Sequence, residues 1–169
     1  MKVVIIKYNS GNTRSITFAL ERFGINPVIT DDFSEITSAD KIILPGVGEA
    51  SSAINYLRER KLDEAILLLK QPVLGICLGM QLMCRSSEEG NTSCMGIFDQ
   101  DVKRFRSELK VPQIGWNAIS DLKTDLFKDI KKEEYMYFVH GYYAELSKNT
   151  IASTNYGIDY SSSLQKNNL

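Results

Sequence analysis

Apolar positions in the first half of the chain follow two alternating patterns. Short apolar runs bounded by turn residues are typical of buried strands, and they cover residues 3–8, 26–30, 41–44 and 73–76. Between them, apolar residues recur with helical spacing over residues 13–23, 50–57, 62–69 and 78–85. In the first of these helices Ile16, Leu20 and Phe23 share one face, and Gly24 favours its end. Strands that alternate with helices predict a parallel sheet with helices on both faces.

The second half of the chain has a different pattern. Helical spacing fades, and strand-like runs separated by turn residues cover residues 101–105, 115–119, 135–143, 151–155 and 161–165. We expect antiparallel strands that join or flank the parallel sheet. With 169 residues and no repeat or linker, the chain is predicted to form one α/β domain over residues 1–169.

Composition excludes several classes of function. A formal net charge of −1 gives no electrostatic case for binding nucleic acid or a membrane surface. The apolar residues 3–6 are too few for a signal peptide or a membrane span, so we expect a cytoplasmic protein. Cys77, Cys84 and Cys94 have no paired spacing, which argues against disulfides and against a zinc site. We expect no metal and no cofactor.

Cys77 lies between Gly75 and Gly79 at the end of the fourth predicted strand. This arrangement predicts a strand, a sharp turn and a helix with the thiol at the bend, as in the nucleophile elbow of hydrolases. Backbone N–H groups at the start of such a helix favour the thiolate and can hold an oxyanion. The alternative is a small buried residue, because free cysteine is among the most buried residue types. The pair of glycines favours a nucleophile.

The third predicted strand is followed by Pro45-Gly46-Val47-Gly48. Two glycines allow the backbone to turn its N–H groups toward an anion. In an open α/β sheet this segment would lie at the same edge as Cys77, where ligands bind. Position 51 is Ser51, so the segment is not a dinucleotide-binding fingerprint. An ordinary strand-to-helix turn is the alternative.

His140 is the only histidine in the chain and lies in the predicted strand 135–143. Alternation places it on one face with Met136, Phe138 and Tyr142. One interpretation is a base for Cys77. No carboxylate is evidently placed to orient the ring, so the pattern favours a hydrogen-bonded histidine in a half-buried strand.

The only tryptophan, Trp116, lies among proline, glycine and polar residues in the segment 111–117. Tryptophan usually packs in the core, whereas these neighbours favour a surface loop in which an aromatic residue contacts a partner. Cys84 lies two helical turns after Cys77 and is expected in the core. Cys94 falls in a predicted loop and has no assigned role.

Together these motifs resemble one family. They are similar to the glutaminase subunit of imidazole glycerol phosphate synthase, a class I (triad) glutamine amidotransferase, in the segments 45–48, 75–81, 111–117 and 137–140. Met80 favours this subunit, because sister glutaminases usually have histidine there. The resemblance runs from Met1 to the last residues. It implies the three-layer class I fold, a parallel sheet flanked by helices with antiparallel strands in the second half.

The resemblance also implies a role for each matched residue. Cys77 corresponds to the nucleophile that attacks the side-chain amide of glutamine, which releases ammonia and leaves a thioester for water to cleave. The implied oxyanion hole consists of the backbone N–H groups of Gly46, Val47, Gly48 and Leu78. Glutamine-binding residues are Gly79 and Gln81. The residues that would face a barrel-shaped synthase subunit, in a heterodimer, are Asn12, Pro112, Gln113, Trp116 and Asn117. That subunit would use the ammonia to make imidazole glycerol phosphate in histidine biosynthesis.

Two departures from the family pattern change what is expected. The family usually has serine at the position of Gly141, and glycine is expected to loosen substrate contacts. The triad histidine and glutamate of the family lie in a Phe-His-Pro-Glu-Lys-Ser type motif beyond Leu169, so both are absent from this chain. We therefore expect a C-terminally truncated member that lacks a final strand and helix. Loss of a triad member typically costs on the order of 10⁴ to 10⁶ in turnover, which predicts weak activity.

Two other functions stay open. One is a noncatalytic docking subunit, a pseudo-glutaminase of the same synthase that binds glutamine weakly. The other is a cysteine-dependent stress or redox protein of related topology, which Gln81 and Trp116 disfavour.

Overall fold

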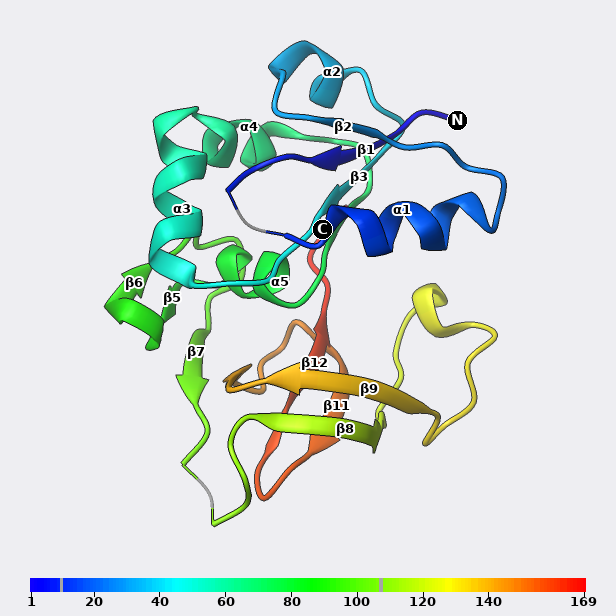
Figure 1. Ribbon diagram of the computed structural model, residues 1–169. Coiled ribbons are helices and arrows are strands. Elements are labelled where there is room, and N and C mark those ends of the chain that lie inside the picture. Colours follow the sequence, from blue (N-terminus) through cyan, green and yellow to red (C-terminus); the bar gives the residue numbers. More distant parts are fainter. Residues whose placement is uncertain (10, 107) are drawn as a thin grey trace.

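The computed structural model describes residues 1–9, 11–106 and 108–169. Parallel strands in the order β2-β1-β3-β4 form the centre of the first half (Figure 1). Their bounds are β1 Val3–Ile6, β2 Val28–Thr30, β3 Lys41–Leu44 and β4 Val73–Gly75. Every residue of β1 is buried, as expected of a parallel strand covered on both faces. The predicted parallel sheet is confirmed.

Helices cover both faces of this sheet. They are α1 Thr13–Glu21, α2 Phe33–Thr37, α3 Ala50–Glu59, α4 Leu62–Leu68 and α5 Leu78–Met83. Ile16 and Leu20 of α1 pack on one face, against Val3, Ile5 and Ile43. The opposite face, which includes Val4 and Ile6, packs with apolar residues of α2, α3 and α4. The helices predicted from apolar spacing are therefore confirmed, and the short α2 was not predicted.

Phe23 does not share the inner face of α1 as predicted. Its side chain is 82% exposed. The helix ends at Glu21, and Gly24 then turns the chain with a φ of +72°. Phe23 lies between these two residues, past the end of the helix, so its ring does not continue the inner face. Gly24 follows the helix as expected, three residues after the last helical residue, Glu21.

The second half forms two further sheets. One has the strand order β11-β12-β10-β7-β5-β6, and β8 pairs with β9 in a separate two-stranded ribbon (Figure 1). The six strands of the larger sheet are β5 Ser86–Ser87, β6 Thr92–Ser93, β7 Asp101–Arg104, β10 Tyr142–Ala144, β11 Thr150–Asn155 and β12 Asp159–Leu164. The ribbon consists of β8 Gln113–Ala118 and β9 Tyr135–His140. Two 3-10 turns, η1 Glu89–Asn91 and η2 Asp125–Phe127, complete the half.

Two expectations for the second half need correction, and one is confirmed. The run 135–143 is two strands rather than one, because the chain bends at Gly141 and β9 and β10 enter different sheets. The segment 111–117 is a strand from Gln113 onward, not a surface loop, because it pairs with β9 along its length. As expected, the second-half strands flank the parallel sheet and pair antiparallel in the larger sheet, except that β5 and β7 are parallel.

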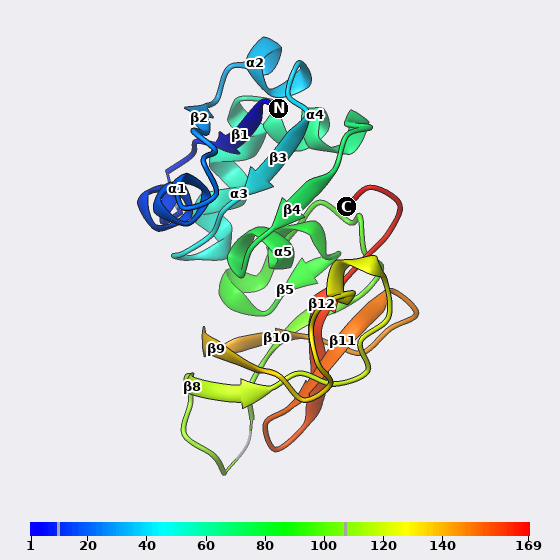
Figure 2. The same ribbon diagram turned by 90° about the vertical axis from the view of Figure 1, so that its right-hand side faces the viewer.

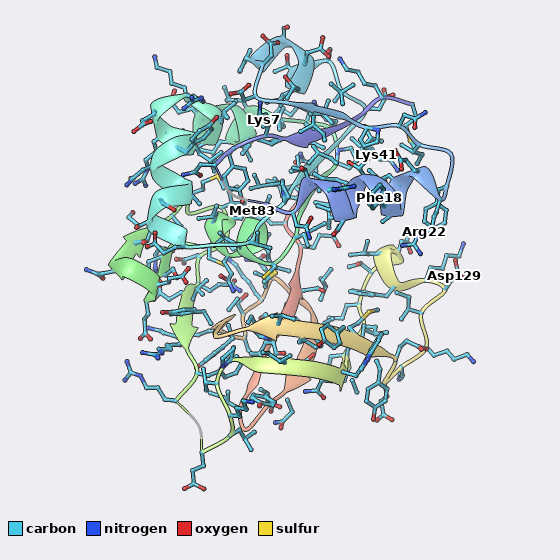
Figure 3. The ribbon with its side chains drawn as sticks, in the orientation of Figure 1. Lys7, Phe18, Arg22, Lys41, Met83 and Asp129 are labelled. Carbon is cyan, nitrogen blue, oxygen red and sulfur yellow. The ribbon has the colours of Figure 1, made fainter. Side chains whose placement is uncertain are left out.

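The main core continues from the parallel sheet into the second half. It runs through α3 and α5 to Phe98, Val102 and Ala144. Figure 2 shows α5 between the parallel sheet above and the second-half strands below, and Figure 3 places Met83 of α5 near the middle of the molecule. Cys84 lies in this core as predicted, and Cys94 is buried there too.

Among the residues that the structure describes, no helix has the length and apolar character needed to cross a bilayer.

Candidate functional site

Cys77 lies at a sharp bend between β4 and α5, at the carboxyl edge of the parallel sheet. Its φ of 52° and ψ of −112° fall in a region that side chains with a Cβ rarely adopt. The bend is held on both sides, since the N–H of Ile76 donates to the carbonyl of Leu44 at 3.0 Å and that of Gln81 to the carbonyl of Cys77 at 3.0 Å. Cys77 is exposed as a residue, while protein atoms surround much of its thiol. The predicted strand, turn and helix are present, with the sulfur at the turn.

The backbone of residues 45–48 packs directly against the start of α5. A Cβ on Gly46 would lie 2.3 Å from the backbone nitrogen of Gly79, and a Cβ on Gly79 would lie 2.1 Å from the carbonyl oxygen of Leu44. Only glycine permits this approach. On the other side, the buried hydroxyl of Tyr8 donates to the carbonyl of Pro45. These contacts hold residues 45–48 beside Cys77.

A cavity of 590 Å³ opens at this point, within the range of about 300 to 1,000 Å³ typical of small-molecule sites. Its lining includes predicted site residues from four parts of the chain, namely Asn12, Gly46, Val47, Gly48, Cys77, Leu78, Gln81 and Pro112. A neighbouring cavity of 370 Å³ also contacts Cys77 and Gln81. Gly79 lies behind the first cavity, packed on β3.

The pKa of the Cys77 thiol is raised above its ordinary value. Burial is the largest cause, the nearby Glu89 carboxylate adds to it, and a hydrogen bond from the N–H of Leu78 opposes it. The start of α5 was predicted to favour the thiolate, but that stabilisation is smaller than the cost of burial. Attack by this sulfur therefore needs a proton acceptor.

This shift predicts a specific pH dependence for alkylation of Cys77. Iodoacetamide should react more slowly at pH 7 than with a free cysteine, because less thiolate is present. The rate should go on rising beyond about pH 8.5, the usual midpoint of a free cysteine. Rates from intact mass spectrometry between pH 6 and 11 test this, with Cys77→Ala to subtract reaction elsewhere. A midpoint below that of free cysteine would contradict the assigned shift.

The His140 ring is already engaged on both nitrogens. Nδ1 donates to the carbonyl of Tyr142 at 2.7 Å, and Nε2 lies 3.1 Å from Oε1 of Gln113 and 3.2 Å from the hydroxyl of Tyr160. Burial lowers the pKa of the ring. The predicted hydrogen-bonded histidine of a half-buried strand is confirmed, and both ring nitrogens face protein partners although His140 lines the cavity of Cys77.

The outer face of the β8–β9 ribbon is aromatic and apolar. Trp116 is 69% exposed and makes an edge contact with Tyr137, with ring centroids 5.5 Å apart, and Ile114 and Val139 are exposed on the same face. Asn117, half-buried, donates to the carbonyl of Asn155 at 2.8 Å, and Asn12 caps α1 by accepting from the N–H of Ser15 at 3.2 Å.

Gln113 differs from the other residues expected to face a partner. Its side chain is 3% exposed and points inward, where it meets His140 and Tyr160. Alternation along β8 explains this, because Gln113 and Trp116 have opposite parity in the strand. Gln113 therefore does not form part of the outer surface of the ribbon.

Glu89 is a site residue that sequence reasoning missed. Its carboxylate lines the cavity with Cys77 and accepts from the N–H of Ala50 at 2.9 Å. Burial, with a smaller effect from Glu49, raises the pKa of this carboxyl. Nothing in the local sequence marks it, because its contact with the start of α3 spans 39 residues.

Comparisons with known proteins agree on one family. The family model for glutamine amidotransferase class-I matches residues 4–165. The chain is 56% identical over 171 residues to the imidazole glycerol phosphate synthase subunit HisH of Bacteroides fragilis, covering 99% of this chain and 87% of that protein. It is 44% identical to HisH of Yersinia pseudotuberculosis, with the same coverage of 99% and 87%. HisH of Haemophilus influenzae is 43% identical, with coverage of 99% and 85%.

Solved structures show the same fold. One titled as a crystal structure of glutamine amidotransferase aligns with a TM-score of 0.70 at 15% identity, covering 93% of this chain and 86% of that chain. A glutamine amidotransferase from Thermotoga maritima aligns with a TM-score of 0.61 at 18% identity, covering 88% and 64%. At these identities the likeness concerns the fold alone, and it confirms the three-layer α/β arrangement expected from the sequence.

Proposed function

Because this chain belongs to the class-I glutamine amidotransferases, among the HisH subunits of imidazole glycerol phosphate synthase, we propose that Cys77 is the nucleophile that hydrolyses glutamine for that synthase. One observation carries the proposal. The thiol stands at a strained turn, within hydrogen-bonding reach of the N–H of Leu78, and it shares a cavity with the backbone of residues 46–48.

The reaction follows from this geometry. Sγ of Cys77 forms a bond to the side-chain amide carbon of glutamine, and the carbon–nitrogen bond breaks to release ammonia. Water then cleaves the glutamyl thioester to give glutamate and restore the thiol. The N–H groups of Leu78 and of residues 46–48 form the oxyanion hole, where removal of one donor typically costs about 10²–10³ in turnover. The proton acceptor that the raised pKa of Cys77 calls for is not His140.

Polar groups around the cavity suit a free amino acid. Gln81 is 7% exposed and lies beside Cys77, and Gly79 keeps the backbone close. The Glu89 carboxylate lines the same cavity and offers a counter-charge for the α-ammonium group of glutamine. We assign Gln81 and Glu89 to substrate binding.

The partner is a barrel-shaped synthase subunit that consumes the ammonia. We place its contact on the outer face of the β8–β9 ribbon, together with Asn12 and Pro112. Tyr137 and Val139 belong to that face and also line the cavity of Cys77. A subunit seated there would cover the cavity mouth, so ammonia could pass between the subunits without entering bulk water.

Trp116→Ala should weaken binding of the synthase subunit by about 30-fold, the effect of losing one aromatic hot spot of about 2 kcal/mol. Titration calorimetry with that subunit measures the affinity. Phe23→Ala is the matched control, because Phe23 is an aromatic residue outside the ribbon that is even more exposed than Trp116, and it should leave the affinity unchanged. Equal affinities for Trp116→Ala and the unmodified chain would remove the ribbon from the interface.

Labelling with 6-diazo-5-oxo-L-norleucine, an electrophilic glutamine analogue, tests the proposed function directly. Intact mass spectrometry should show one adduct, which glutamine prevents and which Cys77→Ala lacks. The measurement is repeated with the synthase subunit present, together with a glutaminase assay. A folded chain that binds the synthase subunit but gains no glutamine-protected adduct would instead be a noncatalytic docking subunit.

A further inference from the structure

The carbonyl of Tyr142 is a junction between His140 and Gln81. It accepts from Nδ1 of His140 at 2.7 Å and from Nε2 of Gln81 at 3.1 Å. A carbonyl can only accept, so Nδ1 carries the proton of the ring and Gln81 presents its amide nitrogen to Tyr142. This bond fixes the direction of the Gln81 amide, beside Cys77.

On the other side of the ring, Nε2 of His140, the hydroxyl of Tyr160 and Oε1 of Gln113 form a triangle with sides of 3.0, 3.1 and 3.2 Å. Because the ring proton is on Nδ1, Nε2 and Oε1 are both acceptors, and the Tyr160 hydroxyl is the donor that they share. Aromatic rings enclose the imidazole, with centroids of Phe105 at 5.2 Å and of Tyr160 at 5.3 Å. Rotation of the ring would break contacts on both nitrogens, so the position of Nδ1 is set by its surroundings.

Gln113 and His140 both belong to the ribbon, where they pair at the ends of β8 and β9. The next residue of β8, Ile114, is exposed on the outer face beside Trp116. The contacts therefore run from the end of the ribbon, at the His140 ring, through the Tyr142 carbonyl to Gln81.

We propose that His140 is a positioning residue for glutamine binding, which sets the Gln81 amide through the Tyr142 carbonyl and so ties it to the end of the β8–β9 ribbon, where His140 lies. The inference rests on the proposed function, because it assigns a purpose to Gln81 in the glutamine pocket. His140 lines the same cavity as Cys77, but both of its ring nitrogens face protein groups, so it is not one of the reacting groups. Its loss should therefore weaken binding of glutamine and leave the chemistry of Cys77 unchanged.

Two substitutions distinguish the roles of the two ring nitrogens of His140. His140→Asn keeps a donor near the position of Nδ1, whereas His140→Gln places its amide near Nε2 and loses the bond to Tyr142. The rate of labelling by 6-diazo-5-oxo-L-norleucine is measured against its concentration, which gives a half-saturating concentration and a maximal rate constant. His140→Gln should raise the half-saturating concentration by about 3- to 10-fold, as expected for one hydrogen bond. The maximal rate should stay within about twofold, and His140→Asn should restore most of the affinity.

The unmodified chain distinguishes the two proposals. If it gains no glutamine-protected adduct, the proposed function fails before His140 is tested. If it is labelled normally, either of two results overturns the positioning role. One is an unchanged half-saturating concentration in His140→Gln, and the other is an equal rise of that concentration in His140→Gln and His140→Asn.

Tyr160→Phe gives a second test that removes only a hydroxyl from the triangle and keeps the packed ring. It should raise the half-saturating concentration in the same direction as His140→Gln, by a smaller factor. An unchanged value would overturn the role of the triangle, even if the His140 variants fold poorly. Thermal unfolding followed by circular dichroism identifies variants that have lost the fold.

Discussion

Replacing Gly79 with alanine is expected to destabilise the fold by about 3 kcal/mol or more, at the upper end of the cost of overpacking. The new methyl group would lie 2.1 Å from the carbonyl oxygen of Leu44 and 3.0 Å from that of Pro45. These are backbone atoms of a core strand and the segment after it, so they cannot turn aside as a flexible side chain can. The start of α5 would have to move away, which would also shift the N–H of Leu78. Urea unfolding followed by circular dichroism measures the loss.

Gly141→Ala is the matched control for this substitution. Its Cβ would meet Val111 at 3.8 Å and Pro112 at 3.9 Å, which is ordinary contact, and Gly141 has no positive φ. The free energy of unfolding should stay within about 0.5 kcal/mol of the unmodified chain. Comparable losses at both glycines, or a stable Gly79→Ala chain, would show that close packing on β3 does not determine the elbow.

The parts of the site that the sequence predicts are those set by local backbone chemistry. An apolar run that ends in a cysteine between glycines leaves few folds other than a strand, a tight turn and a helix. Residues 45–48 are equally predictable, because two glycines directly after the third predicted strand indicate a tight turn. Because parallel strands end at one edge, the predicted sheet was enough to place these two segments side by side.

The parts that sequence reasoning missed depend on partners far along the chain. Glu89 reaches the cavity only because its carboxylate accepts from Ala50. Strand pairing likewise decides that Gln113 points inward while Trp116 points outward, and proline and glycine nearby suggested a loop instead. The raised pKa of Cys77 was missed for a related reason, since burial and the Glu89 carboxylate, which is close in space but not in local sequence, outweigh the effect of the helix start.

Cys77→Gly is expected to abolish labelling by the glutamine analogue, and yet to be more stable than Cys77→Ala by about 1 kcal/mol. Any residue with a Cβ is strained at a φ of 52° and a ψ of −112°, at a cost of about 1–3 kcal/mol. Glycine relieves that strain, although it loses about 0.5–1 kcal/mol more backbone entropy on folding than alanine. Alanine keeps the strain and removes only the sulfur. Urea midpoints of the two variants give the difference, and intact mass gives the loss of the adduct.

Cys84 supplies the matched pair for this comparison, because it is a buried cysteine at the other end of α5 with an ordinary φ of −69°. There Cys84→Gly should be less stable than Cys84→Ala by about 0.5–1 kcal/mol, the usual order for these residues. A reversed order at Cys77 alone would show that the elbow destabilises the fold and is held by the contacts of Gly46 and Gly79. The same order at both cysteines would contradict strain at Cys77. A reversal would also show how the thiol reaches the cavity. The packing of Gly46 and Gly79 would then hold Cys77 in a backbone conformation that a relaxed turn would not adopt.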